Sequence, residues 1–288
     1  MKKIGLIGLG AMGFPIAKRL QENGFELCTY VRSKHSLRKA EHLNIQVVDT
    51  PASLSKYTNT VILLVNNYSQ CHHCLYSVDG ILSSLMCGTV IISSTIGPKQ
   101  IKELSSLCPP GVEILDAPIS GGVIGAETGT LVTMVAGKKE RFVSVKNIFA
   151  SYSKKIVYVG EVVGQAQALK AINQMLVGIH MVATAESYAL SQELGIDPQA
   201  MFETISECAG NSNIFHSRIP KLIAEDYSAH ASLQTLEKDT GICKALADMK
   251  HIPCYLTTLC HDLFQQTPSS DPSGEDACAV IRLYKKEK

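Results

Sequence analysis

The chain lacks an excess of charge of either sign. Its 288 residues include 27 lysines and arginines against 26 aspartates and glutamates. That balance argues against general binding to nucleic acid or to a membrane surface, because both attract strongly basic proteins. The chain also has no apolar run approaching the roughly 20 residues that a membrane-spanning helix needs. The composition therefore predicts neither a nucleic acid nor a membrane as a partner.

A second cysteine and histidine cluster is also missing. One cluster, "CHHC" at residues 71–74, has the residue types of metal ligands, but a structural zinc site usually needs another pair at matching spacing. We predict no metal, and we expect the ten cysteines to be reduced and packed as small hydrophobic residues. Glycines at 5, 8 and 10 interrupt the apolar start, unlike a signal peptide, so we expect a cytoplasmic protein.

Repeats and low-complexity linkers are absent, and 45% hydrophobic residues can form a large core. The length suggests about two domains. In the first half, short apolar segments alternate with helical ones, which is typical of a mostly parallel sheet. The expected strands are 3–9, 26–31, 45–48, 60–65, 89–94, 112–119, 130–137 and 154–160. The expected helices are 11–24, 34–43, 51–57, 69–77, 98–107 and 138–150. We predict an α/β Rossmann domain over residues 1–161.

The second half shows helical periodicity only. Apolar residues recur every three or four positions from 164 to 193 without a proline, which predicts one long helix. Further helices are expected at 197–210, 214–225, 231–249 and 255–266, with a short last helix after the polar segment 267–276. We predict an all-α domain over residues 162–288, built on a long interdomain helix. The length and apolar character of that helix favour a homo-dimer or homo-tetramer.

A glycine motif connects the first strand to the first helix. In "GLGAMG", Gly8 permits a tight turn, Gly10 lets the backbone approach a pyrophosphate, and Gly13 lets helix and strand pack closely. The helix N-terminus adds unpaired N–H groups that favour phosphate. We therefore predict a dinucleotide site. The residues assigned to it here are Gly8, Leu9, Gly10, Ala11, Met12 and Gly13.

The second strand lacks the acidic residue that binds the ribose of NAD in this kind of site. Its end reads "TYVRSKH", which places Arg32 and Ser33 there instead. A guanidinium offers a forked donor to a 2′-phosphate, so Arg32 favours NADP, with NAD possible. The alternative is that these residues form an ordinary solvated basic loop.

Three later strands end in polar tips, "VNN" at 65–67, "SST" at 93–95 and "DAPISGG" at 116–122. Ligands of open α/β folds bind beyond the carboxyl ends of the strands, so the convergence of these tips predicts a pocket, although each alone is ordinary turn chemistry. The hydroxyl of Ser120 and the N–H groups of Gly121 and Gly122 suit a carboxylate. The cofactor residues assigned to the other tips are Val65, Asn66 and Thr95.

The segment "GQAQALKAINQ" places a lysine on an apolar helix. Lys170, Asn173 and Gln174 share one helix face, because residues three and four apart are neighbours. A lysine alone at such a position is more simply explained as a side chain that extends to solvent.

These segments together resemble the β-hydroxyacid dehydrogenases, which include 3-hydroxyisobutyrate dehydrogenase and tartronate semialdehyde reductase. The resemblance rests on "GLIGLGAMGFPIAKRL", "DAPISGGVIGAETGTL", "GQAQALKAINQ" and "EKDTG", which follow one another in the family's order over almost the whole chain. The helical half is most similar to L-threonate dehydrogenases in "INQMLVGIHMVATAESYAL", "AGNSNIF" and "DYSAHASLQTLEKDTGI".

The resemblance implies an enzyme and assigns roles to its residues. Lys170 is then the catalytic acid/base, the Ser120 to Gly122 segment holds the substrate carboxylate, and Asn173 or Gln174 contacts the substrate. Lys238, with Asp239, matches a pair that closes over the cofactor and substrate.

The implied reaction is hydride transfer between a nicotinamide cofactor and the hydroxyl-bearing carbon of a C3–C4 hydroxy or sugar acid such as L-threonate. One alternative is a semialdehyde reductase of the tartronate or succinic semialdehyde type. The other is a non-catalytic dinucleotide-binding protein.

Overall fold

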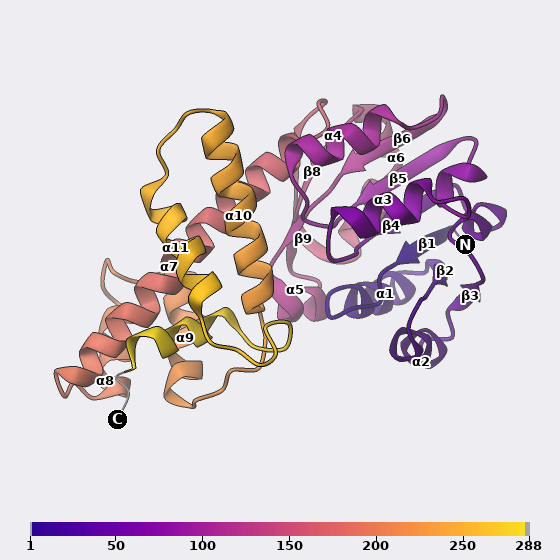
Figure 1. Ribbon diagram of the computed structural model, residues 1–288. Coiled ribbons are helices and arrows are strands. Elements are labelled where there is room, and N and C mark those ends of the chain that lie inside the picture. The colour runs from indigo at the N-terminus through magenta and orange to yellow at the C-terminus, as the bar shows by residue number, and fades with distance from the viewer. Residues whose placement is uncertain (1, 286–288) are drawn as a thin grey trace. The chain divides into compact units, whose positions relative to one another are not determined.

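Nine strands form one sheet in the first 170 residues of the computed structural model, which describes residues 2–285 (Figure 1). Their spatial order is β3-β2-β1-β4-β5-β6-β8-β7, and β9 pairs with β8. β3 to β6 are parallel to one another and to β1 and β2, whereas β8 runs antiparallel to β6 and β7. The strands are β1 (Lys3–Ile7), β2 (Glu26–Tyr30), β3 (Gln46–Val48), β4 (Thr60–Leu63), β5 (Gly88–Ile92), β6 (Val112–Asp116), β7 (Ile119–Ser120), β8 (Leu131–Ala136) and β9 (Ser153–Gly160).

Helices cover both faces of the parallel strands. Successive side chains of a strand point to opposite faces, so Ile62 packs in the apolar cluster that includes the first and sixth helices, while Val61 and Leu63 pack in the cluster of the third and fourth. This burial on both faces of the sheet explains why the strand sequences are continuous apolar runs. The helices are α1 (Gly13–Glu22), α2 (Lys34–His42), α3 (Tyr68–Tyr76), α4 (Pro98–Ser106), α5 (Gly122–Thr128) and α6 (Lys139–Ala150), with 3₁₀ turns η1 (Ala52–Lys56) and η2 (Ile81–Ser83).

The strand order reverses between β1 and β4. From β1 the chain builds outward through β2 to β3, and then returns to place β4 on the other side of β1. Such a reversal leaves a crevice beyond the carboxyl ends of the two central strands, which is where open α/β sheets bind ligands.

The chain divides after residue 170 into two compact units, and the second is helical. α7 (Gln165–Glu193) begins in the first unit and continues into the second. The second unit has its own apolar core, which includes Met181, Phe215, Leu236 and Phe264. Its other elements are α8 (Pro198–Ser206), α9 (Asn213–Ile223), α10 (Leu233–Met249), α11 (Tyr255–Gln266) and the 3₁₀ segment η3 (Ala277–Tyr284).

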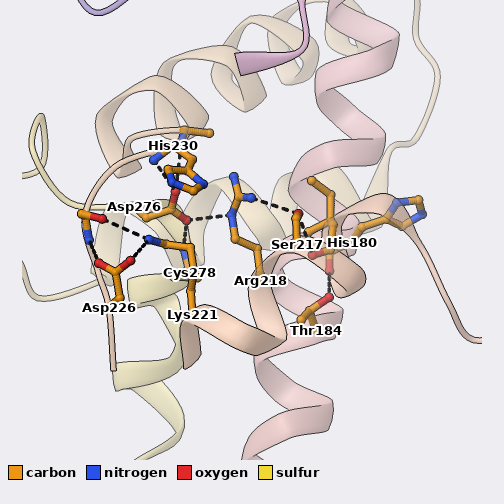
Figure 2. Close-up of polar contacts among 12 residues, drawn as sticks. His180, Thr184, Ser217, Arg218, Lys221, Asp226, His230, Asp276 and Cys278 are labelled. Carbon is orange, nitrogen blue, oxygen red and sulfur yellow. Dashed lines mark hydrogen bonds and ion pairs between the residues drawn. The ribbon is translucent and has the colours of Figure 1, made fainter. Parts of the chain in front are cut away.

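A buried ion pair fastens the C-terminal segment to α9 in this unit (Figure 2). Arg218 Nε lies 2.9 Å from Asp276 Oδ1, and both side chains are almost completely buried. The other carboxylate oxygen of Asp276 accepts hydrogen bonds from the backbone N–H groups of His230 (2.8 Å) and Ala231 (3.0 Å). The Cys278 N–H donates a further hydrogen bond to Oδ1 at 3.1 Å. Both oxygens of Asp276 are therefore satisfied.

The fold confirms the expected Rossmann-like sheet followed by a helical half. Three details of the prediction were wrong. Segment 51–57 is a 3₁₀ turn rather than an α-helix. The strand expected over 112–119 splits into β6 and β7, because Pro118 has no N–H to continue a ladder. Helix α5 was not predicted, and its glycines have poor helix propensity. The domain boundary at 161/162 stays a prediction.

All ten cysteines are free thiols, and Cys87 and Cys208 are the exposed ones. Within "CHHC", Cys71 and Cys74 face the core, whereas His72 and His73 are exposed on α3. Over residues 2–285, no three metal-ligating side chains come together as a group. Across the same residues, no helix combines the length and the apolar character that crossing a membrane requires.

Candidate active site

The glycine turn after β1 packs directly against β4. Gly8 has a φ of +111°, and a Cβ added there would overlap the carbonyl oxygen of Leu64. A Cβ on Gly13 would overlap the carbonyl oxygen of Gly8, so α1 can approach the turn only with glycine at that position. Gly10 has open space around its Cα, with no atom within 4 Å of an added Cβ. The backbone at Gly10 is thus accessible to a ligand, as a dinucleotide site requires.

A pocket of about 200 Å³ lies beside this turn, over the switch between β1 and β4. It is formed by the turn itself, the end of β2 and the end of β4, and α3 contributes Gln70, His73 and Cys74. The predicted cofactor residues that line it are Gly8, Leu9, Gly10, Arg32, Ser33, Val65 and Asn66. The predicted residues Ala11, Met12, Gly13 and Thr95 do not line it. Gln70 and His73 were not predicted, because α3 shows no signal for nucleotide binding in sequence.

The end of β2 presents a polar, exposed edge to this pocket. Arg32 is exposed, and the hydroxyl of Ser33 accepts a hydrogen bond from the Ser36 N–H at 3.1 Å, so Ser33 caps α2. A pocket wall with an exposed guanidinium, a serine and a helix N-terminus fits a phosphate group.

Hydrogen bonds connect the polar tips of the neighbouring strands. The Val65 N–H after β4 donates to Ser94 Oγ at 2.8 Å, which joins the "VNN" and "SST" tips. Gln167 of α7 joins the second tip to the helix: its Nε2 donates to the Ser94 carbonyl, and its Oε1 accepts from the Ile96 N–H, both at 3.0 Å. Thr95 lies between these two bonded residues. The tips therefore meet at one edge of the sheet.

The third tip reaches the same helix through Asp116, the last residue of β6. Its Oδ2 accepts hydrogen bonds from the backbone N–H groups of Gly164 (2.8 Å), Ala166 (3.1 Å) and Gln167 (3.1 Å). The carboxyl group is fully buried, and burial raises its pKa to about 6 although these hydrogen bonds oppose the shift. Asp116, at the end of β6, therefore caps the N-terminus of α7.

Neither Asp116 nor Gln167 was assigned a role from the sequence. Capping signals are sought within a few residues of a helix start, whereas Asp116 lies 48 residues before Gly164. Their only sequence signal was membership of the quoted segments "DAPISGG" and "GQAQALKAINQ".

Lys170 follows one turn after this capped start. It belongs to the first unit and only 7% of its surface is exposed, which is unusual for lysine. Ser120 ends β7, where it pairs with Val132 of β8. Gly121 and Gly122 follow with φ of +132° and +63°, a backbone that favours glycine and begins α5.

Polar side chains of the second unit form a chain of contacts. Asn173 Nδ2 donates to Gln174 Oε1 at 2.9 Å, and Gln174 Nε2 donates to Asp239 Oδ2 at 2.6 Å. Lys238 Nζ lies 3.2 Å from the other oxygen of Asp239. Gln174 and Asp239 are buried, whereas Asn173 is half-buried. Asn173, Gln174 and Lys238 are thus brought together.

Comparisons with known proteins agree with this arrangement. Residues 3–160 match the family described as the NAD binding domain of 6-phosphogluconate dehydrogenase. Residues 164–284 match NAD-binding of NADP-dependent 3-hydroxyisobutyrate dehydrogenase. The chain is 31% identical to an L-threonate dehydrogenase of Cupriavidus necator, over 98% of this chain and 96% of that protein. The chain belongs to the β-hydroxyacid dehydrogenase family.

Other β-hydroxyacid dehydrogenases are similar over the full length. Human mitochondrial 3-hydroxyisobutyrate dehydrogenase is 29% identical, over 99% of this chain and 87% of that protein. The solved structure of 3-hydroxyisobutyrate dehydrogenase from Salmonella typhimurium has the same fold, with a TM-score of 0.89 at 24% identity, over 98% of this chain and 100% of that one. This β-hydroxyacid dehydrogenase is therefore an NAD(P)-dependent oxidoreductase of hydroxy acids.

Proposed function

We propose that this enzyme oxidises a C3–C4 hydroxy or sugar acid such as L-threonate with NADP, and that Lys170 is its catalytic acid/base. The observation that carries the proposal is the burial of Lys170 one turn into a helix whose start is bonded to the loop after β5 and to the last residue of β6. An ammonium withdrawn from water at the ligand-binding edge of the sheet is suited to exchange a proton with an alcohol.

Ser120 and the N–H groups of Gly121 and Gly122 hold the substrate carboxylate. The positive φ of both glycines turns the chain sharply at the start of α5, where helix N–H groups are unpaired and favour an anion. The segment begins at Asp116, which bonds the first turn of α7. The carboxylate site and Lys170 therefore belong to structurally linked segments.

Asn173, rather than Gln174, orients the substrate hydroxyl. The Gln174 amide is engaged at both ends, because its nitrogen donates to Asp239 and its oxygen accepts from Asn173. Gln174 thus holds the Asn173 side chain in place. Lys238, paired with Asp239, contacts the cofactor and substrate.

Arg32 selects the 2′-phosphate of NADP, supported by its exposed position on the pocket wall next to the α2 N-terminus. The open backbone at Gly10 and the absence of an acidic side chain among the residues that line the pocket fit the same assignment. When bound, the nicotinamide accepts or donates the hydride, and the protein supplies position and electrostatics.

The L-threonate assignment rests on the similarity to L-threonate dehydrogenases over nearly the full length. We also propose a homo-dimer or homo-tetramer, because α7 exposes the apolar side chains of Ile172, Leu176 and Leu190. The free thiols support the cytoplasm as the expected compartment.

The test is an assay of L-threonate, 3-hydroxyisobutyrate and other C3–C4 hydroxy acids with NADP and NAD, and of the matching semialdehydes with the reduced cofactors. Lys170→Ala should lower kcat by roughly 10²–10⁴-fold, the usual contribution of a positioned acid/base, while cofactor binding survives. Lys170→Arg should not restore the rate, since a guanidinium cannot accept the proton.

Three outcomes would contradict parts of this proposal. Turnover of Lys170→Ala near the wild-type rate would remove Lys170 from the mechanism. Activity with semialdehydes only would favour the reductase. Nucleotide binding without turnover on any compound would favour a non-catalytic protein.

A further inference from the structure

Asp116 is bound in an unusual way for a buried carboxylate. Its Oδ2 accepts hydrogen bonds from the backbone N–H groups of Gly164, Ala166 and Gln167, and the Gln167 side chain also favours the ionised carboxyl group. Its Oδ1 is buried and has no hydrogen-bond partner among residues 2–285. The hydrogen bonds that the Asp116 carboxylate accepts therefore come from the start of α7.

Gln167 makes the second attachment of the same turn. Its side chain is 1% exposed and bridges the carbonyl of Ser94 and the N–H of Ile96, in the loop after β5. The first turn of α7 is thus attached to two neighbouring strands, through β6 by Asp116 and through β5 by Gln167. Lys170 lies three residues after Gln167, on the adjacent turn of the helix.

We propose that Asp116 and Gln167 are positioning residues that fix the place of Lys170 over the substrate site. This inference rests on the proposed role of Lys170 as the acid/base. A group that transfers a proton must lie within hydrogen-bond reach of the reacting oxygen, and a displacement of 1 Å can lower the rate about 100-fold. Two attachments from different strands restrain both the rotation and the shift of the turn that carries Lys170.

Asp116→Asn tests the first attachment with almost no change in volume. The amide places an NH₂ group either against the three N–H donors or at the buried Oδ1 position, which has no hydrogen-bond partner among the described residues. The capping bonds also lose their charge assistance. We expect kcat to fall about tenfold, while KM for the hydroxy acid and Kd for NADP change less than threefold.

A double-mutant cycle with Lys170→Ala separates positioning from general damage. If Asp116 acts through Lys170, Asp116→Asn should lower kcat less than twofold once Lys170 is absent, because the residue it positions is gone. The matched control is Asp197→Asn, which alters an exposed aspartate that caps α8 through the Ala200 N–H at 2.8 Å. This control should leave kcat within twofold of wild type.

The inference fails if Asp116→Asn leaves kcat unchanged, if it lowers kcat by the same factor without Lys170, or if Asp197→Asn has an equal effect. Should Asp116→Asn not fold, Gln167→Ala enters the same cycle under the same criteria, since alanine retains helix propensity and removes the bridge to Ser94 and Ile96. A fully active Lys170→Ala would instead show that the proposed function itself is wrong.

Discussion

Each half of the chain contains a buried aspartate that joins two of its elements. The two carboxylates differ in their hydrogen-bond and ion-pair partners. Asp276 in the helical half pairs with the Arg218 guanidinium, and both its oxygens are hydrogen bonded. Asp116 in the sheet half accepts hydrogen bonds from backbone N–H groups at one oxygen, and its other oxygen has no partner among the described residues. Asp276 is thus suited to rigid fastening, whereas the charge of Asp116 is only partly offset by a helix N-terminus.

The two halves also differ in other charged and polar groups. In the helical half, Lys221 pairs with Asp226 beside the Arg218 and Asp276 pair, so the charges largely satisfy one another (Figure 2). In the sheet half, Arg32 and Ser33 line an open pocket. Charged groups of the helical cluster thus pair with one another, whereas Arg32 faces a pocket.

The largest expected effect is on stability in the helical half. Asp276→Asn leaves the Arg218 guanidinium buried without a counter-ion, and breaking such a pair costs about 3–5 kcal/mol. Urea denaturation should show this loss in the free energy of unfolding, while kcat of the folded fraction stays near wild type. A loss below about 1 kcal/mol would show that Asp276 and Asp116 do not differ in this way.

The next effect concerns the pH dependence of stability and comes from Asp116. Burial raises the pKa of Asp116 from 3.8 to about 6, so the folded state retains the proton more strongly than the unfolded chain. Its stabilising contribution is complete below about pH 4 and is lost as pH rises through about 6, a change of about 3 kcal/mol.

The variant Asp116→Asn cannot titrate at this position. The stability of wild type relative to the variant should therefore fall between about pH 4 and pH 6.5, as measured by urea denaturation at several pH values in that range. A constant difference across the range would exclude a raised pKa for Asp116.

The third effect is on cofactor affinity and should leave stability unchanged. Arg32→Asp removes a charge-assisted contact to the 2′-phosphate and should weaken NADP by about 1.5–3 kcal/mol while sparing NAD. Isothermal titration with both dinucleotides measures this, with Lys34→Ala as a control at the neighbouring exposed residue. A wild-type enzyme that prefers NAD tenfold would contradict the assignment.

The smallest effect is on substrate binding. Ser120→Ala removes one hydroxyl donor and should raise KM for acidic substrates roughly 3- to 10-fold, the value of a single neutral hydrogen bond, with cofactor affinity nearly unchanged. Steady-state kinetics on hydroxy acids and on the corresponding uncharged alcohols provide the comparison. Equal KM effects on both classes would remove Ser120 from the carboxylate site.

Features that depend on neighbouring residues were predictable from the sequence. The turn at Gly8 and Gly13 was predictable, because the glycine spacing, the preceding strand and the following helix are close together in the sequence. The strand tips were predictable because every parallel strand ends at the same edge of the sheet. The presence of Arg32 at one of these tips was enough to favour NADP over NAD as the predicted cofactor.

Features that depend on distant residues were not predictable. The cap on α7 joins residues 48 positions apart, and only the folded sheet brings Asp116 to that helix. Helix α5 was missed for a related reason. Its residue Gly125 has poor helix propensity, but a Cβ there would press on the Leu131 side chain, so packing rather than propensity selects the residue. The hydrogen bond from Gln174 to Asp239 likewise could not be predicted without the tertiary structure.

The distribution of the free thiols has a practical consequence. Burial raises the pKa of several of them, including Cys28 to about 11 and Cys243 to about 12, so these side chains remain unreactive thiols near neutral pH. The two exposed cysteines fall one in each half, Cys87 in the sheet half and Cys208 in the helical half. The native chain can therefore carry one fluorescent donor and one acceptor dye, and energy transfer between them would follow how the halves respond to cofactor and substrate.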